Sequence, residues 1–340
     1  MRAAVYYNNN DVRVEERPRP STGPGEALVR IEASGICGSD VMEWYRIKKA
    51  PLVLGHEIAG TIVETGAGVD RFKAGDRVTV AHHVPCNTCK YCLAGNHSVC
   101  DTLRATNFDP GGFCEFVRVP AVNVDRGTFI LPDNVSFEEG TFTEPLGCVV
   151  RALRMARFSP GMSVLVIGSG MSGLLHIKLS RALGAGRIIA TDINEFRLKA
   201  AGAAGADLTL RADADVPGAV RSALGTLADL VIICAASDSA IGQGLKSVDR
   251  GGTVILFAPK EPWATYPMPL FDLWRDNITI INSYASPPHD TQVALGLIAS
   301  RRVEVKDMVS HRLGLGEAQR GFRLAAEARE SIKVIIEPQR

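Results

Sequence analysis

The chain has 340 residues and is nearly neutral, because 38 lysine and arginine residues balance 37 aspartate and glutamate residues to a net charge of +1 with the histidines neutral. This balance argues against nucleic-acid binding, which usually needs a clustered basic surplus. Hydrophobic residues make up 46% of the chain and charged residues 22%, which excludes a disordered or fibrous protein. At roughly 150 residues per domain, the length predicts two domains.

The N-terminal segment has no continuous apolar stretch after Arg2, so its pattern does not predict a secretory signal. No window of about 18 uninterrupted apolar residues occurs, and we therefore expect no membrane contact or membrane span. The chain has eight cysteines. Without a secretory signal, these favour metal binding or buried thiols over disulfides. We expect a cytoplasmic protein.

Up to about residue 145, the sequence predicts short strands separated by turns rich in glycine and proline. This pattern favours an antiparallel, barrel-like β domain. The expected strands are residues 3–7, 26–33, 57–64, 76–80 and 113–119.

From Ser163 onward, apolar runs alternate with helix-like segments. The expected strands are residues 164–167, 188–191, 206–210, 230–234, 254–257 and 278–281, with helices at 171–183, 195–204 and 219–224. Continuous runs of valine, isoleucine and leucine between helices are typical of a doubly wound parallel sheet buried on both faces. The tail returns to a mixed pattern, with an amphipathic helix at 318–328 and a last strand at 332–336. The predicted class is α/β.

A glycine-rich turn follows the expected strand at residues 163–167 and opens the next helix. It reads G-x-G-x-x-G: the first glycine allows the tight turn, the second lets the backbone approach a diphosphate, and the third lets helix and strand pack closely. The N-terminus of the helix also attracts the diphosphate charge. The turn therefore predicts a dinucleotide site. Its residues are Gly168, Gly170, Met171, Ser172 and Gly173.

Asp192 ends the next expected strand, 24 residues after Gly168. A carboxylate at this place can accept hydrogen bonds from both ribose hydroxyls and would repel a 2′-phosphate, which favours NAD(H) over NADP(H). The alternative is an ordinary helix–sheet turn followed by a surface aspartate. Arg197, five residues further on, either contacts the adenine side of the cofactor or is a solvated helix residue.

Four cysteines follow the spacing C-x2-C-x2-C-x7-C within 15 residues. They are Cys86, Cys89, Cys92 and Cys100. Four thiolates in one loop match a closed tetrahedral structural zinc site. Sulfur ligands also suit an iron–sulfur cluster, but no proline follows the fourth cysteine and no second set exists. We predict a structural zinc site that takes no part in the chemistry.

A second set of metal-ligand residues is dispersed along the chain. Cys37 lies in GICGSD, His56 and Glu57 lie in GHE, and Glu144 lies in EPL. One cysteine, one histidine and one or two carboxylates can hold zinc and leave a position open, as a catalytic site requires. Taken singly, each residue also has a simpler explanation: a buried thiol, a loop histidine or a helix-start carboxylate. The spacing alone does not decide between the two.

Several motifs in the same order resemble those of the zinc-containing medium-chain dehydrogenase/reductase (alcohol dehydrogenase) family across essentially the whole chain. They are GICGSD (35–40), GHEIAGTIVETG (55–66), GDRV (75–78), the four-cysteine loop, EPL (144–146), VLVIGSGMSG (164–173) and TDINEFRL (191–198). The GHE and EPL forms most resemble the polyol (sorbitol) and threonine dehydrogenase branch. The resemblance implies a discontinuous GroES-like β-rich catalytic domain at residues 1–147 and 286–340, and a Rossmann NAD-binding domain at residues 148–285.

The resemblance also implies residue roles. Cys37, His56 and Glu57 correspond to protein ligands of a catalytic zinc ion, and Glu144 to a carboxylate at the same metal. In this branch the two glutamates can alternate between binding the metal directly and acting through water. Ser39 matches the hydroxyl that accepts the proton of the substrate alcohol. The resemblance thus implies two zinc ions per chain, one catalytic and one structural, together with NAD(H).

The sequence departs from the family at two points. Many members have a histidine five residues after the catalytic cysteine, which passes the substrate proton to solvent, but here the position is Met42. Methionine cannot relay a proton, so this chain needs another route, such as Glu43 or water beside the cofactor ribose. The segment from Cys37 to His56 is also short compared with many polyol dehydrogenases, which shortens the expected substrate loop.

These observations predict a zinc-dependent oxidoreductase that transfers a hydride between NAD(H) and a secondary alcohol or ketone, with a polyol, cyclitol or sugar-like compound as substrate. One alternative is a reductase of an aldehyde or an anionic ketone. An alternative of a different class is a non-catalytic NAD-binding zinc protein, against which the joint presence of the four dispersed ligand residues counts. Family members are dimers or tetramers, so the resemblance implies a homodimer or homotetramer.

Overall fold

The computed structural model describes residues 1–340, and they form two compact units. The first unit combines Met1–Gly147 with Ala285–Arg340, and the second consists of Cys148–Tyr284. The helix α6 (Thr143–Met155) contains the first boundary between them. None of the helices combines the length and the apolar character needed to cross a membrane.

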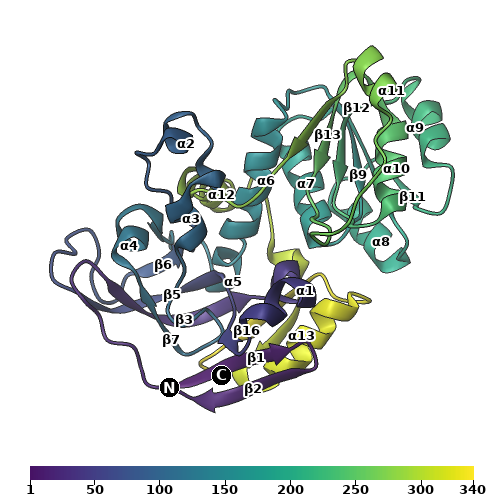
Figure 1. Cartoon of the computed structure of the whole chain (residues 1–340). Helices are drawn as coiled ribbons and strands as arrows, with labels where there is room; N and C mark the ends of the chain where they lie inside the picture. The colour runs from purple at the N-terminus through teal and green to yellow at the C-terminus, as the bar shows by residue number, and fades with distance from the viewer. The chain divides into compact units, whose positions relative to one another are not determined.

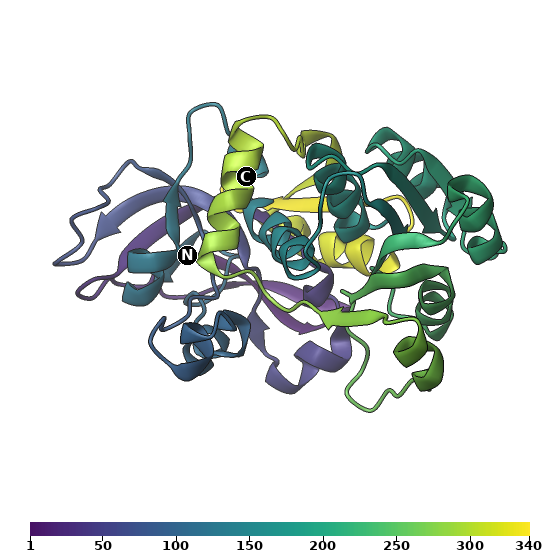
Figure 2. The same cartoon turned by 90° about the horizontal axis from the view of Figure 1, so that it is seen from above.

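The first unit is built on a seven-stranded sheet in the order β15-β16-β3-β5-β6-β8, with β7 also paired to β3. The pair β15–β16 is parallel, whereas the other pairs are antiparallel. Figures 1 and 2 show the yellow C-terminal strands beside the purple N-terminal ones. The strands are β3 (Ala27–Gly35), β5 (Glu57–Thr65), β6 (Arg77–Val80), β7 (Phe116–Val119), β8 (Thr128–Ile130), β15 (Val309–Gly314) and β16 (Lys333–Glu337).

A smaller antiparallel sheet, in the order β2-β1-β4, completes the β structure of this unit. Its strands are β1 (Arg2–Asn8), β2 (Asp11–Glu16) and β4 (Leu52–Val53). The two sheets share one apolar core, in which the rings of Tyr6 and Phe113 both pack against that of Phe322. The helices of the unit are α1 (Glu43–Arg46), α2 (Lys90–Leu93), α3 (Asp101–Ala105), α4 (Ala121–Gly127), α5 (Phe137–Gly140), α12 (Pro288–Ala299) and α13 (Ala318–Glu327).

The second unit is a six-stranded sheet in the order β11-β10-β9-β12-β13-β14, and all neighbouring strands are parallel. The helix α7 contacts α8, and α9 contacts α10; α7 and α10 lie on opposite sides of the sheet (Figure 1). The strands are β9 (Ser163–Ile167), β10 (Arg187–Asp192), β11 (Leu208–Arg211), β12 (Ala228–Ile233), β13 (Val248–Leu256) and β14 (Thr279–Asn282). The helices are α7 (Met171–Ala182), α8 (Glu195–Ala203), α9 (Val216–Leu224), α10 (Asp238–Ser247) and α11 (Leu270–Arg275).

This strand order is that of the doubly wound dinucleotide-binding fold, in which the order reverses between the first and fourth strands. Here the reversal lies between β9 and β12. Both strands are almost fully buried runs of valine, leucine and isoleucine, as parallel strands covered on both faces require. The predicted α/β class, with a β-rich part and a parallel sheet, is confirmed.

One expected strand is shorter than the sequence pattern indicates. The pattern covers residues 113–119, but β7 begins only at Phe116. The three residues before it bond to β1 instead: the N–H of Ala4 donates to the carbonyl of Phe113 over 2.8 Å, and the N–H of Glu115 donates to the carbonyl of Arg2 over 3.1 Å. The segment therefore leaves one sheet and enters the other, which apolar periodicity does not reveal.

Candidate metal and cofactor sites

Cys37 follows the end of β3 and forms the N-cap of a short 3-10 turn, Gly38–Asp40. The sulfur accepts from the N–H and the hydroxyl of Ser39, each over 3.5 Å, while Asp40 accepts from the N–H of Cys37 over 3.0 Å. This reciprocal capping ties the thiol and the two following polar side chains into one rigid turn. The motif GICGSD thus places three chemically active groups together.

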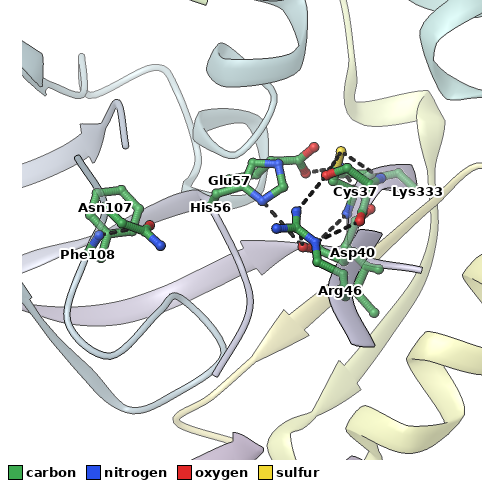
Figure 3. Close-up of polar contacts among 10 residues, drawn as sticks. Cys37, Asp40, Arg46, His56, Glu57, Asn107, Phe108 and Lys333 are labelled. Carbon is green, nitrogen blue, oxygen red and sulfur yellow. Dashed lines mark hydrogen bonds and ion pairs between the residues drawn. The ribbon is translucent and has the colours of Figure 1, made fainter. Parts of the chain in front are cut away.

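His56 and Glu57 reach the same place from the start of β5. Gly55 before them has a φ of +98°, and a Cβ there would lie 2.8 Å from the backbone nitrogen of Phe113, so only glycine fits. One ligand atom each from Cys37, His56 and Glu57 lie within 4.8 Å of one another (Figure 3). A thiol, an imidazole and a carboxylate gathered in this way form a donor set that zinc accepts.

Asp40 lies behind His56. Its carboxylate is fully buried, 3.4 Å from Nδ1 of His56 and 3.6 Å from the guanidinium of Arg46. Burial by itself lowers the pKa of His56, but the negative charges of Asp40 and Cys37 outweigh burial and hold this pKa well above its usual value. A carboxylate on one ring nitrogen orients the imidazole and leaves the other nitrogen for a metal.

Arg46, on α1, contacts Ser39 at two points. Its Nε donates to the Ser39 carbonyl over 2.9 Å and its Nη2 to the Ser39 hydroxyl over 3.0 Å. An arginine can only donate, so one acceptor position of the Ser39 hydroxyl is occupied. The hydroxyl proton points at the sulfur of Cys37, and one further acceptor position stays free for another partner.

Two further histidines, His82 and His83, lie next to His56. The ring of His82 lies 4.7 Å from that of His56 and 3.8 Å from that of His83, between centroids. Nδ1 of His83 lies 2.8 Å from the carbonyl oxygen of Leu103. Burial lowers the pKa of both His82 and His83, that of His83 to about 4, so both rings are neutral near pH 7.

Glu144 lies near the start of α6 and is 7% exposed. Its carboxylate is not among the ligand atoms that gather at Cys37, His56 and Glu57. The structure thus brings together three of the four dispersed ligand residues that the sequence singled out.

The sulfur atoms of the four cysteines in the C-x2-C-x2-C-x7-C loop lie within 4.8 Å of one another. The sulfur of Cys86 is 3.6 Å from that of Cys100 and 4.0 Å from that of Cys92. Backbone N–H groups of Thr88 and Cys89 point at Cys86, and these hydrogen bonds lower its pKa to about 5. Four sulfurs gathered in this way fit a closed tetrahedral metal site.

The glycine turn of the second unit links β9 to α7. Gly168 has a φ of +94°, which favours glycine, and a Cβ on Gly173 would lie 2.0 Å from the carbonyl oxygen of Gly168. Gly170 is the N-cap of α7. The turn therefore brings a bare backbone and a helix N-terminus to the carboxyl end of β9, where dinucleotide diphosphates bind in this fold.

Asp192 ends β10 beside this turn and is 6% exposed. Its two carboxylate oxygens accept from the N–H groups of Ser169 over 2.8 Å and Asn194 over 2.9 Å. The guanidinium of Arg197 lies 3.7 Å from the position of a Cβ on Gly170, and its Nε is buried without a hydrogen-bond partner. Arg197 is thus partly buried, with its guanidinium near the turn.

A doubly wound sheet with this glycine turn, joined to a β-rich unit with a Cys–His–Glu group and a four-cysteine group, defines a zinc- and nicotinamide-dependent dehydrogenase. The sequence matches the alcohol dehydrogenase GroES-like domain over residues 23–127 and the zinc-binding dehydrogenase domain over residues 173–300. The chain belongs to the zinc-dependent medium-chain alcohol dehydrogenase family.

Individual proteins agree with this assignment over nearly their full length. Sorbitol dehydrogenase of Gallus gallus is 33% identical over 346 residues, covering 98% of this chain and 95% of the relative. The alcohol dehydrogenase TADH from Thermus sp. ATN1 is 32% identical with a TM-score of 0.88, covering 99% of each chain. A zinc-binding dehydrogenase from Sinorhizobium meliloti 1021, bound to NADP, is 27% identical with a TM-score of 0.89, covering 99% of each chain.

The predicted resemblance and the predicted class of activity are confirmed. The chain is an oxidoreductase of the family that uses zinc and a nicotinamide cofactor to interconvert alcohols and carbonyl compounds. Three residues at the site escaped prediction: Asp40, Arg46 and Lys333. Asp40 lies inside the recognised GICGSD motif, which was a usable signal, whereas Arg46 and Lys333 carry no signal in the local pattern.

Proposed function

We propose that Cys37, His56 and Glu57 hold a catalytic zinc ion, with Glu144 able to join the same metal. One observation carries this proposal: the three ligand atoms lie within 4.8 Å of one another, and Oε1 of Glu57 is buried without a hydrogen-bond partner. A buried carboxylate oxygen with no donor is costly unless a cation binds it. The residues therefore fit a zinc ion.

The four-cysteine group holds a second, structural zinc ion in this proposal. Its four sulfur donors fill the tetrahedral coordination of a zinc ion, so no position is left for a substrate. The chain then carries two zinc ions. Metal analysis of the purified protein tests this directly: about two zinc ions per chain support the enzyme, and about one supports a non-catalytic zinc protein that only binds NAD(H). Cys37→Ser is expected to lose one zinc ion and the activity while staying folded.

When bound, zinc supplies Lewis acidity to the substrate oxygen, and the nicotinamide accepts the hydride. Ser39 accepts the proton of the substrate alcohol. Because Arg46 occupies one acceptor position of the Ser39 hydroxyl, a second one is left to receive this proton, and the hydroxyl releases its own proton to water or to Glu43 in the same step. Asp40 holds His56 in one orientation through Nδ1.

We propose residues 1–147 and 286–340 as the catalytic domain and residues 148–285 as the NAD-binding domain. The cofactor lies along the turn of residues 168–173, with Met171 and Ser172 at the start of α7, and Asp192 binds the adenosine ribose. We propose NAD(H) as the natural cofactor, since the Asp192 carboxylate would repel a 2′-phosphate. Arg197, with its unpartnered Nε, contacts the adenosine side.

The S. meliloti relative, bound to NADP, makes the comparison of cofactors necessary. The kcat/KM for NAD+ is expected to exceed that for NADP+ in the wild type. Asp192→Ala is expected to narrow this ratio, because it removes the charge that rejects the 2′-phosphate. A wild-type preference for NADP+ would reverse the cofactor assignment.

The proposed substrate is a secondary alcohol of a polyol, cyclitol or sugar-like compound, which the chain oxidises to a ketone. Support comes from the GHE and EPL motifs and from the similarity to sorbitol dehydrogenase. The test is an NAD+ reduction screen over polyols, cyclitols, amino alcohols and simple secondary alcohols. Turnover confined to the reverse direction, with an aldehyde or anionic ketone and NADH, would favour the alternative of a reductase.

We also propose a homodimer or homotetramer. The strand β14 is the edge of the second unit's sheet, and the segment before it exposes large apolar side chains. These are Trp263, Leu270, Phe271 and Trp274, each at least 64% exposed. An exposed edge strand beside apolar side chains favours pairing with a second copy. Light scattering of the wild type and of Trp274→Glu tests this, and a monomeric wild type would refute it.

A cytoplasmic location completes the proposal. All eight cysteines are free of disulfides, which suits a reducing compartment. Cell fractionation of the tagged protein provides the test.

A further inference from the structure

Lys333 is a fully buried lysine that reaches Glu57 across an intervening strand. Lys333 begins β16 and Glu57 begins β5, and β3 lies between these two strands. In the register, Gly35 of β3 is opposite both Ile335 and Glu57. Lys333 lies two residues before Ile335, and residues two apart in a strand share a face. The ammonium and the carboxylate therefore meet over Gly35, and both side chains are 0% exposed.

The glycine at position 35 is what makes room for this pair. A Cβ there would lie 2.3 Å from Oε2 of Glu57, 2.6 Å from Cε of Lys333 and 2.8 Å from Nζ of Lys333. No other residue fits while the ion pair stays in place.

The two oxygens of Glu57 have different surroundings. Oε2 accepts a hydrogen bond from Nζ of Lys333, which also donates to the carbonyl of Ile36 over 3.2 Å. Oε1 is buried and has no hydrogen-bond partner. Figure 3 shows the pair beside Cys37 and His56. Oε1 is thus the oxygen without a competing cation, and Oε2 would have to share its lone pairs with Lys333 to bind a metal as well.

We propose that Lys333 restricts Glu57 to one-oxygen binding of the catalytic metal and weakens the site's hold on that metal. The inference rests on the proposed assignment of Cys37, His56 and Glu57 as ligands. Lys333 is a positioning residue here, since it acts through Glu57.

Two physical effects give the proposal its direction. The fixed positive charge of Lys333 repels a divalent cation only one carboxylate away, and a low local dielectric strengthens this repulsion. The ion pair also stabilises Glu57 in the metal-free protein, whereas an unpaired buried carboxylate is strongly destabilising. Both effects lower the gain from metal binding. A neutral residue at position 333 should therefore tighten metal retention and, because Glu57 then donates more charge, lower the rate of the chemical step.

The test measures zinc release from the wild type and from Lys333→Met into excess EDTA. The release phase that is missing in Cys37→Ser identifies the catalytic site. Lys333→Met is expected to slow this phase by about tenfold, a change similar in size but opposite in sign to the loss of metal affinity usual when an outer-shell partner is removed, and to lower kcat. A residue with a merely structural role would speed release when removed, so unchanged or faster release overturns the proposal.

Two further variants serve as controls. Lys333→Arg keeps the charge and the donors and should release zinc close to the wild-type rate. Glu57→Gln removes the partner, and adding Lys333→Met to it should slow release no further. Slowing that persists in the Glu57→Gln background would place the effect elsewhere and overturn the proposal.

Lys333→Gln, which keeps a hydrogen-bond donor without the charge, replaces Lys333→Met if that variant does not fold. Failure of both to fold even with zinc present would overturn the proposal, because bound metal should then satisfy Glu57. If the wild type shows a single release phase, from the four-cysteine site, then the assignment of Cys37, His56 and Glu57 as metal ligands fails. Two release phases with no slowing in the variants would overturn the role of Lys333 alone.

Discussion

The carboxylate of Asp40 is a single group with contacts to much of the proposed catalytic site. It accepts from the N–H of Cys37, lies 3.4 Å from Nδ1 of His56 and 3.6 Å from Arg46. Burial raises the pKa of Asp40, but the charges of His56 and Arg46 outweigh it and lower this pKa below its usual value. Asp40 is therefore ionised and can orient the imidazole near neutral pH.

Asp40→Asn should weaken zinc binding at this site or lower kcat/KM by about 10- to 100-fold, since carboxylates behind metal-bound histidines have effects of this size. Zinc titration and steady-state kinetics measure the two quantities. Asp11→Asn, which breaks only an exposed pair with Arg13, is the control. Wild-type zinc affinity together with wild-type kinetics in Asp40→Asn would show that His56 needs no orienting partner.

Gly173 has a comparable role in the second unit. Its substitution by alanine places a Cβ 2.0 Å from the backbone oxygen of Gly168, and a backbone atom cannot move aside cheaply. Gly173→Ala should weaken NADH binding at least tenfold, measured by fluorescence titration. Gly202→Ala, in α8 with no atom near the added Cβ, should bind NADH normally and gain up to about 1 kcal/mol in stability. Equal NADH affinity in the two variants would contradict the role of the turn.

At the scale of elements, α5 is fixed by a reciprocal capping box. The N–H of Glu139 donates to Ser136 Oγ over 3.2 Å, and the N–H of Ser136 donates to Glu139 over 2.8 Å, while Arg301 also binds the Glu139 carboxylate. Burial raises the pKa of Glu139, but the hydrogen bonds from Ser136 and Arg301 outweigh burial and lower it. The ionised carboxylate thus stabilises the fold.

The pKa of Glu139 is lower in the folded protein than in the unfolded chain. The stabilisation is therefore fully present above the unfolded pKa, and it is lost as the pH falls through the folded pKa. Glu139→Gln should therefore lower the free energy of unfolding by about 1–2 kcal/mol at pH 7, and the difference from wild type should shrink below about pH 4. Denaturant unfolding across this pH range measures it. The exposed Glu330→Gln should change little at any pH, and a constant difference for Glu139→Gln would contradict the linkage.

Elements also show where sequence reasoning succeeds and where it stops. The glycine turn and the four-cysteine loop are predictable because all their residues lie within one short segment, whose spacing carries the geometry. The strands β2, β4, β8 and β15 were missed: β4 and β8 have only two and three residues, and all four lie as strands because of the neighbours they pair with in the sheets. Arg46 and Lys333 were missed for the same reason: each matters only through a partner that the folded sheet or turn brings to it.

At the scale of the molecule, two compact units with separate cores divide the chemistry. The cofactor turn lies wholly in the second unit, whereas the Cys–His–Glu group lies wholly in the first. Cys37→Ser should therefore bind NADH with a dissociation constant within about threefold of wild type, although it loses the catalytic zinc. Calorimetric titration of the full chain tests this. Loss of NADH binding in Cys37→Ser would contradict the proposed division.

The pairing of Lys333 with Glu57 joins residues 276 positions apart. During synthesis, the three proposed ligands emerge from the ribosome early, but the strand that carries their buried counter-charge emerges last. Until β16 inserts beside β3, the Glu57 carboxylate lacks the ammonium of Lys333. On the proposal above, the last strand to be synthesised therefore sets how tightly the finished chain holds its catalytic metal.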